Sequence, residues 1–292
     1  MDTLMDVSAL NNRMTSGQRT VLLDVRWALG DPHGRGHYLK EHIPGAVYVD
    51  LPTQLAEPAD PGHGRHPLPP VQKLQEYARC WGISSGDVVV AYDDSGNMAA
   101  ARLWWMLRNA GLEDIHLLDG GLPAWRAAGL PVEGGLEQAV LGDVILGDDA
   151  MPAIDAAAAA EWPRGGVLLD ARAGERYRGE IEPVDPRAGH IPGAVSAPTT
   201  GNLSDDGRFL PPDELRLRFS ELGVTQEGRT AVYCGSGVTA AHQIAALEIA
   251  GFSAALFPGS FSQWSSNAAN PVVAGAAQYA APGVAGSQAA PA

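Results

Sequence analysis

The chain repeats itself, and this repetition constrains its fold more than any other feature of the sequence. Four segments of the first half return in the second half in the same order, at a spacing of about 140 to 148 residues. The pairs are VLLDVR (21–26) with VLLDAR (167–172), HIPGAV (42–47) with HIPGAV (190–195), 88–101 with 230–242, and 111–132 with 251–272. Self-similarity of this kind indicates a duplicated structural unit. The 292 residues therefore predict two domains of ordinary size and similar architecture.

Each half alternates short apolar runs with helical stretches. Short apolar runs bounded by polar or turn residues predict buried parallel strands, and they lie at 21–23, 88–91, 115–118, 167–169, 231–233 and 254–257. Helices are predicted at 71–79, 99–110, 213–222 and 239–250. Alternating strands and helices favour a parallel sheet that is covered on both faces. We therefore predict the α/β class, with two tandem domains that each hold a parallel sheet between helices.

The predicted domains span residues 1–133 and 151–274. The stretch 134–150 is rich in Gly and Asp without a clear period, and we expect it to be a linker. Residues 275–292 are mostly Ala, Gly and Pro with almost no charge, which predicts a disordered tail. No run of about 18 apolar residues is present, and no basic cluster precedes an apolar stretch at the N-terminus. We therefore expect a cytoplasmic protein without a membrane partner.

Charge and cysteine content narrow the possible functions. The formal charge of -14 argues against a general binder of nucleic acid or of anionic membranes, because surfaces of the same sign repel. A small anionic substrate remains compatible, since a few arginines can form a local positive pocket. The two cysteines, Cys80 and Cys234, form neither a CxxC pair nor a zinc-ligand spacing. We expect no disulfide framework and no metal site.

Cys234 stands where a reactive group is expected in a parallel sheet. It follows the strand predicted at 231–233 and enters the short loop CGSGVT, and ligands bind beyond the carboxyl ends of such strands. Gly235 and Gly237 let the loop curl so that backbone N–H groups face the sulfur, and the next helix adds the positive end of its dipole. Both effects favour thiolate over thiol, so Cys234 is the predicted nucleophile. Cys80 lacks such a loop, and we expect it to be a buried structural cysteine.

The two halves differ at one informative position. The first half holds Asp93 where the second holds Cys234. Because a carboxylate cannot carry sulfur, we expect the first half to be catalytically inactive and to form one wall of the active-site cleft. The HIPGAV motif is present in both halves, so its expected role is structural, with Pro-Gly forming a turn and Ala-Val opening a strand.

In these residues the chain resembles the tandem rhodanese family over about residues 21–273, and CGSGVT resembles the loop of its 3-mercaptopyruvate sulfurtransferase branch. The resemblance implies a sulfurtransferase without a cofactor, in which Cys234 takes sulfur from a small anionic donor as a persulfide. The implied acceptor is a thiol, such as thioredoxin, or cyanide. The thiosulfate-preferring branch carries basic residues directly after the cysteine. Gly235 and Ser236 hold those positions here, so 3-mercaptopyruvate is the favoured donor and thiosulfate the second.

The resemblance also implies residues that bind the donor. Arg176 and Arg187 correspond to two arginines that hold the donor carboxylate, although the spacing between them is two residues longer than expected. A planar guanidinium can grip a carboxylate through two parallel hydrogen bonds, which suits this role. Gly235, Gly237 and Val238 are the expected loop contacts.

Proton transfer at the sulfur is implied for three further side chains. Ser236 and Thr239 offer hydroxyl groups in the loop, and His66 matches the family's histidine. The aspartate of the relay is expected at position 52, which is Pro52 here. Two alternatives stay open: Asp50 substitutes for it, or the relay is absent.

Two other functions fit parts of the pattern. A persulfide carrier or sulfur-sensing module would use Cys234 only to accept sulfur from a dedicated partner, and turnover of small donors distinguishes an enzyme from it. A cysteine-dependent phosphatase needs a longer loop with an arginine six positions after the cysteine. Ala240 stands there, so a phosphatase is a remote alternative.

Overall fold

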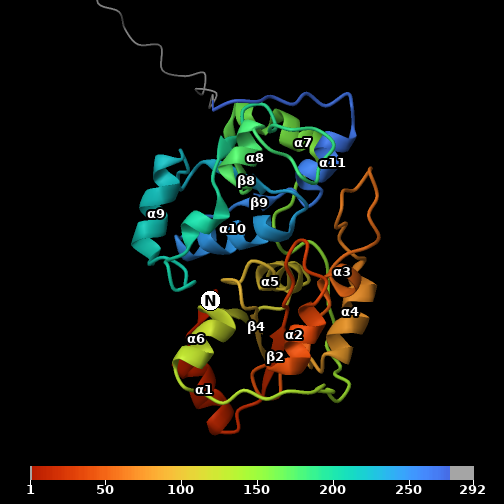
Figure 1. The fold of residues 1–292 in the computed structure, drawn as a ribbon, viewed down its shortest axis with the longest axis vertical. Helices are drawn as coiled ribbons and strands as arrows, with labels where there is room; N and C mark the ends of the chain where they lie inside the picture. Colours follow the sequence, from red (N-terminus) through yellow and green to blue (C-terminus); the bar gives the residue numbers. More distant parts are fainter. Residues whose placement is uncertain (1, 277–292) are drawn as a thin grey trace, which may run out of the picture.

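The structure, a computed structural model, describes residues 2–276 and contains one parallel sheet in each half (Figure 1). The predicted tail, 275–292, lies almost wholly outside the described residues. The first sheet has the order β1-β5-β4-β2-β3 and the second β7-β6-β8-β9, and all strand pairs are parallel. The strands are β1 (Leu4–Met5), β2 (Thr20–Asp24), β3 (Val47–Tyr48), β4 (Val88–Tyr92), β5 (Ile115–Leu118), β6 (Gly166–Asp170), β7 (Val195–Ser196), β8 (Arg229–Tyr233) and β9 (Ala255–Leu256).

Helices cover both faces of the sheets, as predicted. Separate apolar clusters fill the two faces of each sheet, because strands buried on both sides need a core on each side. The helices are α1 (Val7–Thr15), α2 (Gly34–Lys40), α3 (Leu51–Gln54), α4 (Val71–Cys80), α5 (Ala100–Asn109), α6 (Gly121–Ala127), α7 (Ala156–Glu161), α8 (Gly174–Arg178), α9 (Pro212–Glu221), α10 (Val238–Ile249) and α11 (Ser260–Ser266), with two short 3-10 turns, η1 (Trp162–Arg164) and η2 (Thr199–Asn202).

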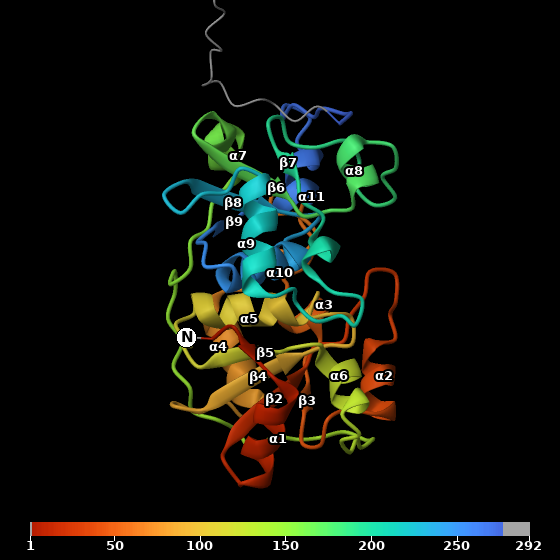
Figure 2. The ribbon, with the colours of Figure 1, turned by 90° about the vertical axis from the view of Figure 1, so that its left-hand side faces the viewer.

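The two domains share one hydrophobic core, with α5 and α10 packed against each other between the sheets (Figures 1 and 2). Residues 100–107 of α5 are all buried, and so are most residues of α10. A helix that is apolar on every side is buried on every side. Each of these helices follows the loop at the end of its central strand, so their packing brings the two loop regions toward each other.

Equivalent residues of the two halves occupy equivalent places. Asp24 pairs with Tyr92 across β2 and β4, and Asp170 pairs with Tyr233 across β6 and β8. The strands and helices predicted from the sequence are present with shifts of one or two residues at their ends. Asp93 and Cys234 therefore lie one residue beyond the same point of their sheets.

The HIPGAV copies have the structural role that was predicted. The rings of His42 and His190 are buried and stack on Tyr38 and Tyr177, with ring centroids 4.1 and 3.7 Å apart. In both copies the last residue of the motif opens a short strand, β3 or β7. The motif ties the chain to the sheet in both halves and contributes no side chain to the cavity described below.

The connection between the domains contains no helix or strand from residue 128 to residue 155. It is nevertheless packed onto the first domain, where the side chains of Val144 and Leu146 are buried. The Gly142 N–H donates to the carbonyl of Arg79, and the Val144 N–H donates to that of Ile83.

Candidate active site

Cys234 begins the loop between β8 and α10, and its side chain is buried. The N–H of Gly237 donates to the Cys234 Sγ at 3.1 Å, as the curled glycine loop predicts. Gly237 has φ +79°, and a Cβ there would lie 2.3 Å from the carbonyl oxygen of Pro258. Only glycine fits this position, because the backbone is left-handed and another segment passes directly beside it.

A strained serine anchors the backbone of Cys234. Ser260, the first residue of α11, has φ +51°, a conformation that costs a non-glycine residue of the order of 1–3 kcal/mol. Its Oγ accepts the N–H of Cys234 at 3.1 Å and donates to the carbonyl of Phe257. The first half has Gly121 at the equivalent place, with φ +55°. The strain at this position thus accompanies the cysteine, because glycine takes the same conformation in the first half without strain.

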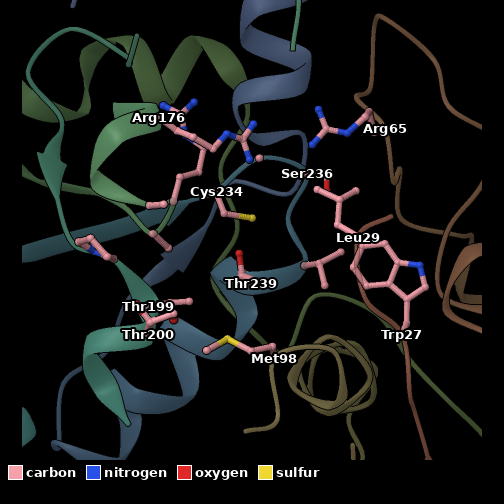
Figure 3. Close-up of a pocket in the computed structure, with 16 residues that line it drawn as sticks. Trp27, Leu29, Arg65, Met98, Arg176, Thr199, Thr200, Cys234, Ser236 and Thr239 are labelled. Carbon is pink, nitrogen blue, oxygen red and sulfur yellow. The ribbon is translucent and has the colours of Figure 1, made fainter. Parts of the chain in front are cut away.

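The sulfur lies in a cavity of about 340 Å³ with walls from both domains (Figure 3). Trp27, Leu29, Arg65 and Met98 come from the first domain. The second domain contributes Cys234 with Ala171, Arg172, Ala173, Arg176, Pro198, Thr199, Thr200, Gly235, Ser236, Val238 and Thr239. The predicted loop residues Gly235, Ser236, Val238 and Thr239 therefore line the same cavity as the nucleophile. The first half forms one wall of the site, as expected.

Three arginines surround this cavity, and one of them was missed from the sequence. Arg176 lines it as predicted, together with Arg172 and with Arg65 from the first domain. A Cβ at Gly235 would lie 2.9 Å from Nη2 of Arg65 and 3.5 Å from Nη1 of Arg176. Two guanidinium groups therefore stand beside the reactive loop, although the loop itself has no basic residue. Arg65 is distant from Cys234 in the sequence, and only the packing of the domains reveals it.

Arg187 does not join them, which corrects the prediction that it binds the donor. Its guanidinium donates to four carbonyl groups around the end of α11, those of Trp264, Ser265, Asn267 and Asn270. It does not line the cavity. Arg187 instead binds the carbonyl end of a helix, which cationic side chains stabilise.

His66 contacts the reactive loop from the first domain. Its Nδ1 lies 2.8 Å from the Oγ of Ser236, and its ring packs edge-on against Trp27. Burial lowers the pKa of His66 to about 4, and the positive charges of Arg102 and Arg65 act in the same direction. The imidazole is therefore neutral at physiological pH.

The structure gives His66 no acidic partner at Asp50. The carboxylate of Asp50 accepts the hydroxyl of Thr53 at 2.8 Å, and among the described residues no hydrogen bond joins Asp50 to His66. This geometry gives no support to Asp50 as a substitute for the aspartate of the relay, and the hydrogen-bond partner that His66 has at the loop is Ser236.

Arg102 is a second residue that sequence reasoning missed. This fully buried arginine of α5 donates to the carbonyl of Gly237 at 3.2 Å and to that of His66 at 2.9 Å. Burial lowers its pKa to about 10, while the nearby Cys234 works in the opposite direction. Arg102 thus links the histidine segment to the cysteine loop across the domain interface. The sequence feature that could have identified Arg102 is an arginine among the apolar residues of a predicted helix.

Cys80 differs from its expectation. It is the last residue of α4 and is exposed, so the prediction of a buried cysteine is wrong. The helix ends there, and Cys80 lies on the solvent side of its last turn, whereas Ala78 of the same turn is buried. Cys80 does not line the cavity, and the glycine loop found around Cys234 is absent from its surroundings.

A possible metal-ligand group lies elsewhere in the first domain. One ligand atom from each of His42, Glu133 and Glu137 falls within 4.8 Å of the others. None of these residues lines the cavity, so the group is separate from the candidate site.

In the described part of the chain, no helix is long and apolar enough to cross a membrane.

Comparison with known proteins matches both halves of the repeat to one family. The model of the rhodanese-like domain matches residues 6–128 and 154–267. A putative thiosulfate sulfurtransferase, SseB, of Mycobacterium tuberculosis is 46% identical over 277 residues, which cover 94% of this chain and 98% of that protein. A probable 3-mercaptopyruvate sulfurtransferase of Pseudomonas aeruginosa is 47% identical over 265 residues, which cover 87% of this chain and 92% of that protein.

A solved structure of a sulfurtransferase has a fold similar to that of this chain. The crystal structure of SseA from Escherichia coli, described as a 3-mercaptopyruvate sulfotransferase, matches with a TM-score of 0.78 at 29% identity. The match covers 90% of this chain and 100% of that one. The two bacterial relatives are named for different sulfur donors, so their names leave the donor of this chain to be argued from its cavity.

Proposed function

The chain belongs to the rhodanese family and is a sulfurtransferase, and we propose that Cys234 takes sulfur from 3-mercaptopyruvate in the cavity between its two domains. The observation that carries the proposal is the cavity itself. It combines a buried nucleophile, arginines beside the reactive loop and an apolar wall of Trp27, Leu29 and Met98. A donor with a carboxylate at one end and a carbon-bound thiol at the other matches all three features.

The first step transfers the sulfur to the enzyme. The Cys234 thiolate attacks the donor sulfur, the carbon–sulfur bond breaks, and its electron pair goes to the donor carbon as an enolate. The proton of the donor thiol moves to that carbon, so the products are pyruvate and a Cys234 persulfide anion. We assign the passage of this proton to the Ser236 hydroxyl, which lines the cavity and is hydrogen-bonded to the neutral His66. The Gly237 N–H stabilises negative charge on the sulfur.

The second step passes the sulfur to an acceptor and regenerates the Cys234 thiolate. An acceptor thiolate, such as that of thioredoxin, or cyanide attacks the outer sulfur of the persulfide and leaves with it. The Cys234 thiolate is then the leaving group and is ready for another donor. Both cysteines are free in the structure, which suits a reducing compartment, and we place the reaction in the cytoplasm.

The choice of donor rests on the shape and charge of the cavity. The carbon chain of 3-mercaptopyruvate gains from contact with the apolar wall, whereas thiosulfate, a compact dianion, gains only from charge. The guanidinium groups of Arg65 and Arg176 lie near the loop and could also hold an anion such as thiosulfate, so thiosulfate stays the second donor. Arg176 is the proposed carboxylate ligand, because it lines the cavity and its guanidinium faces the loop (Figure 3).

A donor panel tests the proposal directly. Turnover of 3-mercaptopyruvate, thiosulfate and cysteine persulfide is compared at matched concentrations, with cyanide and thioredoxin as acceptors. We expect the highest kcat/KM for 3-mercaptopyruvate. A clear preference for thiosulfate would overturn the donor assignment. Negligible turnover of every small donor, with sulfur accepted only from a protein partner, would favour a persulfide carrier.

A further inference from the structure

The segment between α8 and β7 places a carboxylate between two arginines of the cavity. Asp185 Oδ2 accepts from Nη2 of Arg176 at 2.9 Å, and Asp185 Oδ1 accepts from Nη1 of Arg65. The side chain of Asp185 is only 1% exposed. The two arginines come from different domains. This arrangement, a carboxylate held by guanidinium groups, is the one that the proposed donor needs.

The same two guanidinium groups reach the loop of the nucleophile. Both lie within 3.5 Å of the position that a Cβ at Gly235 would occupy, one residue from Cys234. Figure 3 shows Arg176 and Arg65 on opposite sides of the cavity mouth, with Cys234 below them. A small anion bound to both arginines would therefore stand beside the reacting sulfur.

The charges of this cluster cancel while Asp185 is in place. Three arginines, Arg65, Arg172 and Arg176, pair with three carboxylates, those of Asp170, Glu182 and Asp185. Arg176 keeps a second partner in Glu182, at 2.6 Å, whereas Arg65 pairs with Asp185 alone among the described residues. An arriving anion thus meets no net positive charge unless one carboxylate leaves.

Asp185 is the carboxylate that has room to leave. Arg65 lines both the cavity of Cys234 and a neighbouring cavity of about 170 Å³, and Asp185 lines the second one. The ion pair therefore lies between the two cavities. The segment that carries Asp185 contains no helix or strand, and the adjacent Val184 is 37% exposed. By contrast, Asp170 ends the central strand β6 and is fixed there.

We propose that Asp185 is an internal competitor for the donor carboxylate, which binds between Arg65 and Arg176 by displacing it toward the neighbouring cavity. This inference rests on the proposed function, because it assumes a donor with a carboxylate. It adds Arg65 as a donor-binding residue and makes the departure of Asp185 a determinant of donor affinity. Glu182 stays on Arg176 and keeps its guanidinium oriented.

Pyruvate binding tests the proposal without sulfur transfer, because pyruvate carries the same carboxylate and no sulfur. Isothermal titration calorimetry compares the wild type with Asp185→Asn, which keeps the side-chain shape and removes its charge. We expect pyruvate to bind about 10-fold more tightly to the variant, the effect of removing one charged hydrogen-bond competitor. Unchanged or weaker binding would overturn the proposal. Glu180→Gln is the control, since Glu180 is exposed, pairs with Arg178 alone among the residues that the structure describes, and lies outside the cavity.

Arg65→Gln provides an independent second test. Loss of this guanidinium should weaken pyruvate binding by about 10-fold, and Asp185→Asn should gain much less in that background. Unchanged affinity in Arg65→Gln would remove Arg65 from the site and refute the proposal, even if Asp185→Asn fails to fold. A wild type that does not turn over 3-mercaptopyruvate would refute the proposed function instead, so the two failures are distinguishable.

Discussion

Asp93 and Cys234 directly follow equivalent strands of the two domains, and both accept hydrogen bonds from the backbone of the loop that they begin. The Asp93 carboxylate accepts the N–H groups of Ser95, Asn97, Ala99 and Ala100 at 2.7 to 3.1 Å. The sulfur of Cys234 accepts the N–H of Gly237 at 3.1 Å. In the first domain the Asp93 carboxylate itself occupies the place where the loop N–H groups would bind an anion, and it is fully buried. In the second domain the sulfur of Cys234 borders a cavity.

Cys234→Ser should abolish sulfur transfer, because a hydroxyl cannot hold the persulfide. Cys80→Ser should leave the rate within about twofold, since Cys80 lies outside the cavity. Intact-mass measurement after donor treatment should show one added sulfur, about 32 Da, on Cys234. Because Cys80 is exposed, the label is mapped by peptide analysis, and a label that requires Cys80 would contradict the assignment.

Asp93→Cys should not create a second working site. The new thiol would be buried as Asp93 is and would lie outside the lining of the Cys234 cavity. It would also leave several N–H groups of the loop without a strong acceptor. We expect a loss of roughly 3 kcal/mol in the free energy of unfolding and no second persulfide. Asp93→Asn, which keeps the shape and one acceptor oxygen, is the matched comparison. A second equivalent of persulfide on residue 93, at the wild-type rate, would disprove this account.

Arg176 and Arg187 should respond differently to the same substitution. Arg176→Ala should lower kcat/KM for 3-mercaptopyruvate by about 10- to 150-fold, the effect of losing a charged hydrogen bond. Arg187→Ala should leave kcat/KM nearly unchanged and lower the free energy of unfolding by about 1–3 kcal/mol, because four carbonyl groups lose their donor. Steady-state kinetics and urea unfolding on both variants decide the point. Equal kinetic losses would restore Arg187 to the site.

The neutral His66 should make stability depend on pH. Burial lowers its pKa to about 4, whereas a histidine in the unfolded chain titrates near 6.5. Between these values the unfolded chain binds more protons, so stability is complete above about pH 6.5 and is lost as the pH falls toward 4. His66→Gln should lose less stability than the wild type between pH 6.5 and 4.5 in urea unfolding. The exposed His63→Gln is the control, and a wild-type-like loss in His66→Gln would rule the explanation out.

A positive charge placed in the loop should shift the donor preference. Ser236→Lys should raise the ratio of kcat/KM for thiosulfate over 3-mercaptopyruvate by about 10-fold, because the dianion gains more from charge at the sulfur. The substitution also removes the bond to His66, so the absolute rates should fall. Ser236→Met, of similar length without charge, separates the two effects. The same ratio in both variants would show that charge in the loop does not select the donor.

The repeat and the local patterns determined the fold from the sequence. Apolar runs of three or four residues and helices that are apolar on almost every side specify buried parallel strands and buried helices. The glycine loop after a strand likewise identified Cys234, because a backbone that curls around one side chain needs glycines close to it, here Gly235 and Gly237. The aligned Asp93 identified the inactive half. These features are local in the chain, and they can therefore be predicted from it.

Only the tertiary structure decided which residues join Cys234 from other segments. Arg65, Arg102 and Ser260 reach the loop because α5 packs on α10 and because α11 turns back beneath the cysteine. Arg187, which the family resemblance placed at the site, is held by carbonyl groups at the end of α11 instead. A sequence does not distinguish an arginine that is solvated from one that lines a cavity. Burial and hydrogen-bond partners, which depend on contacts between distant segments, determine which arginines can hold an anion.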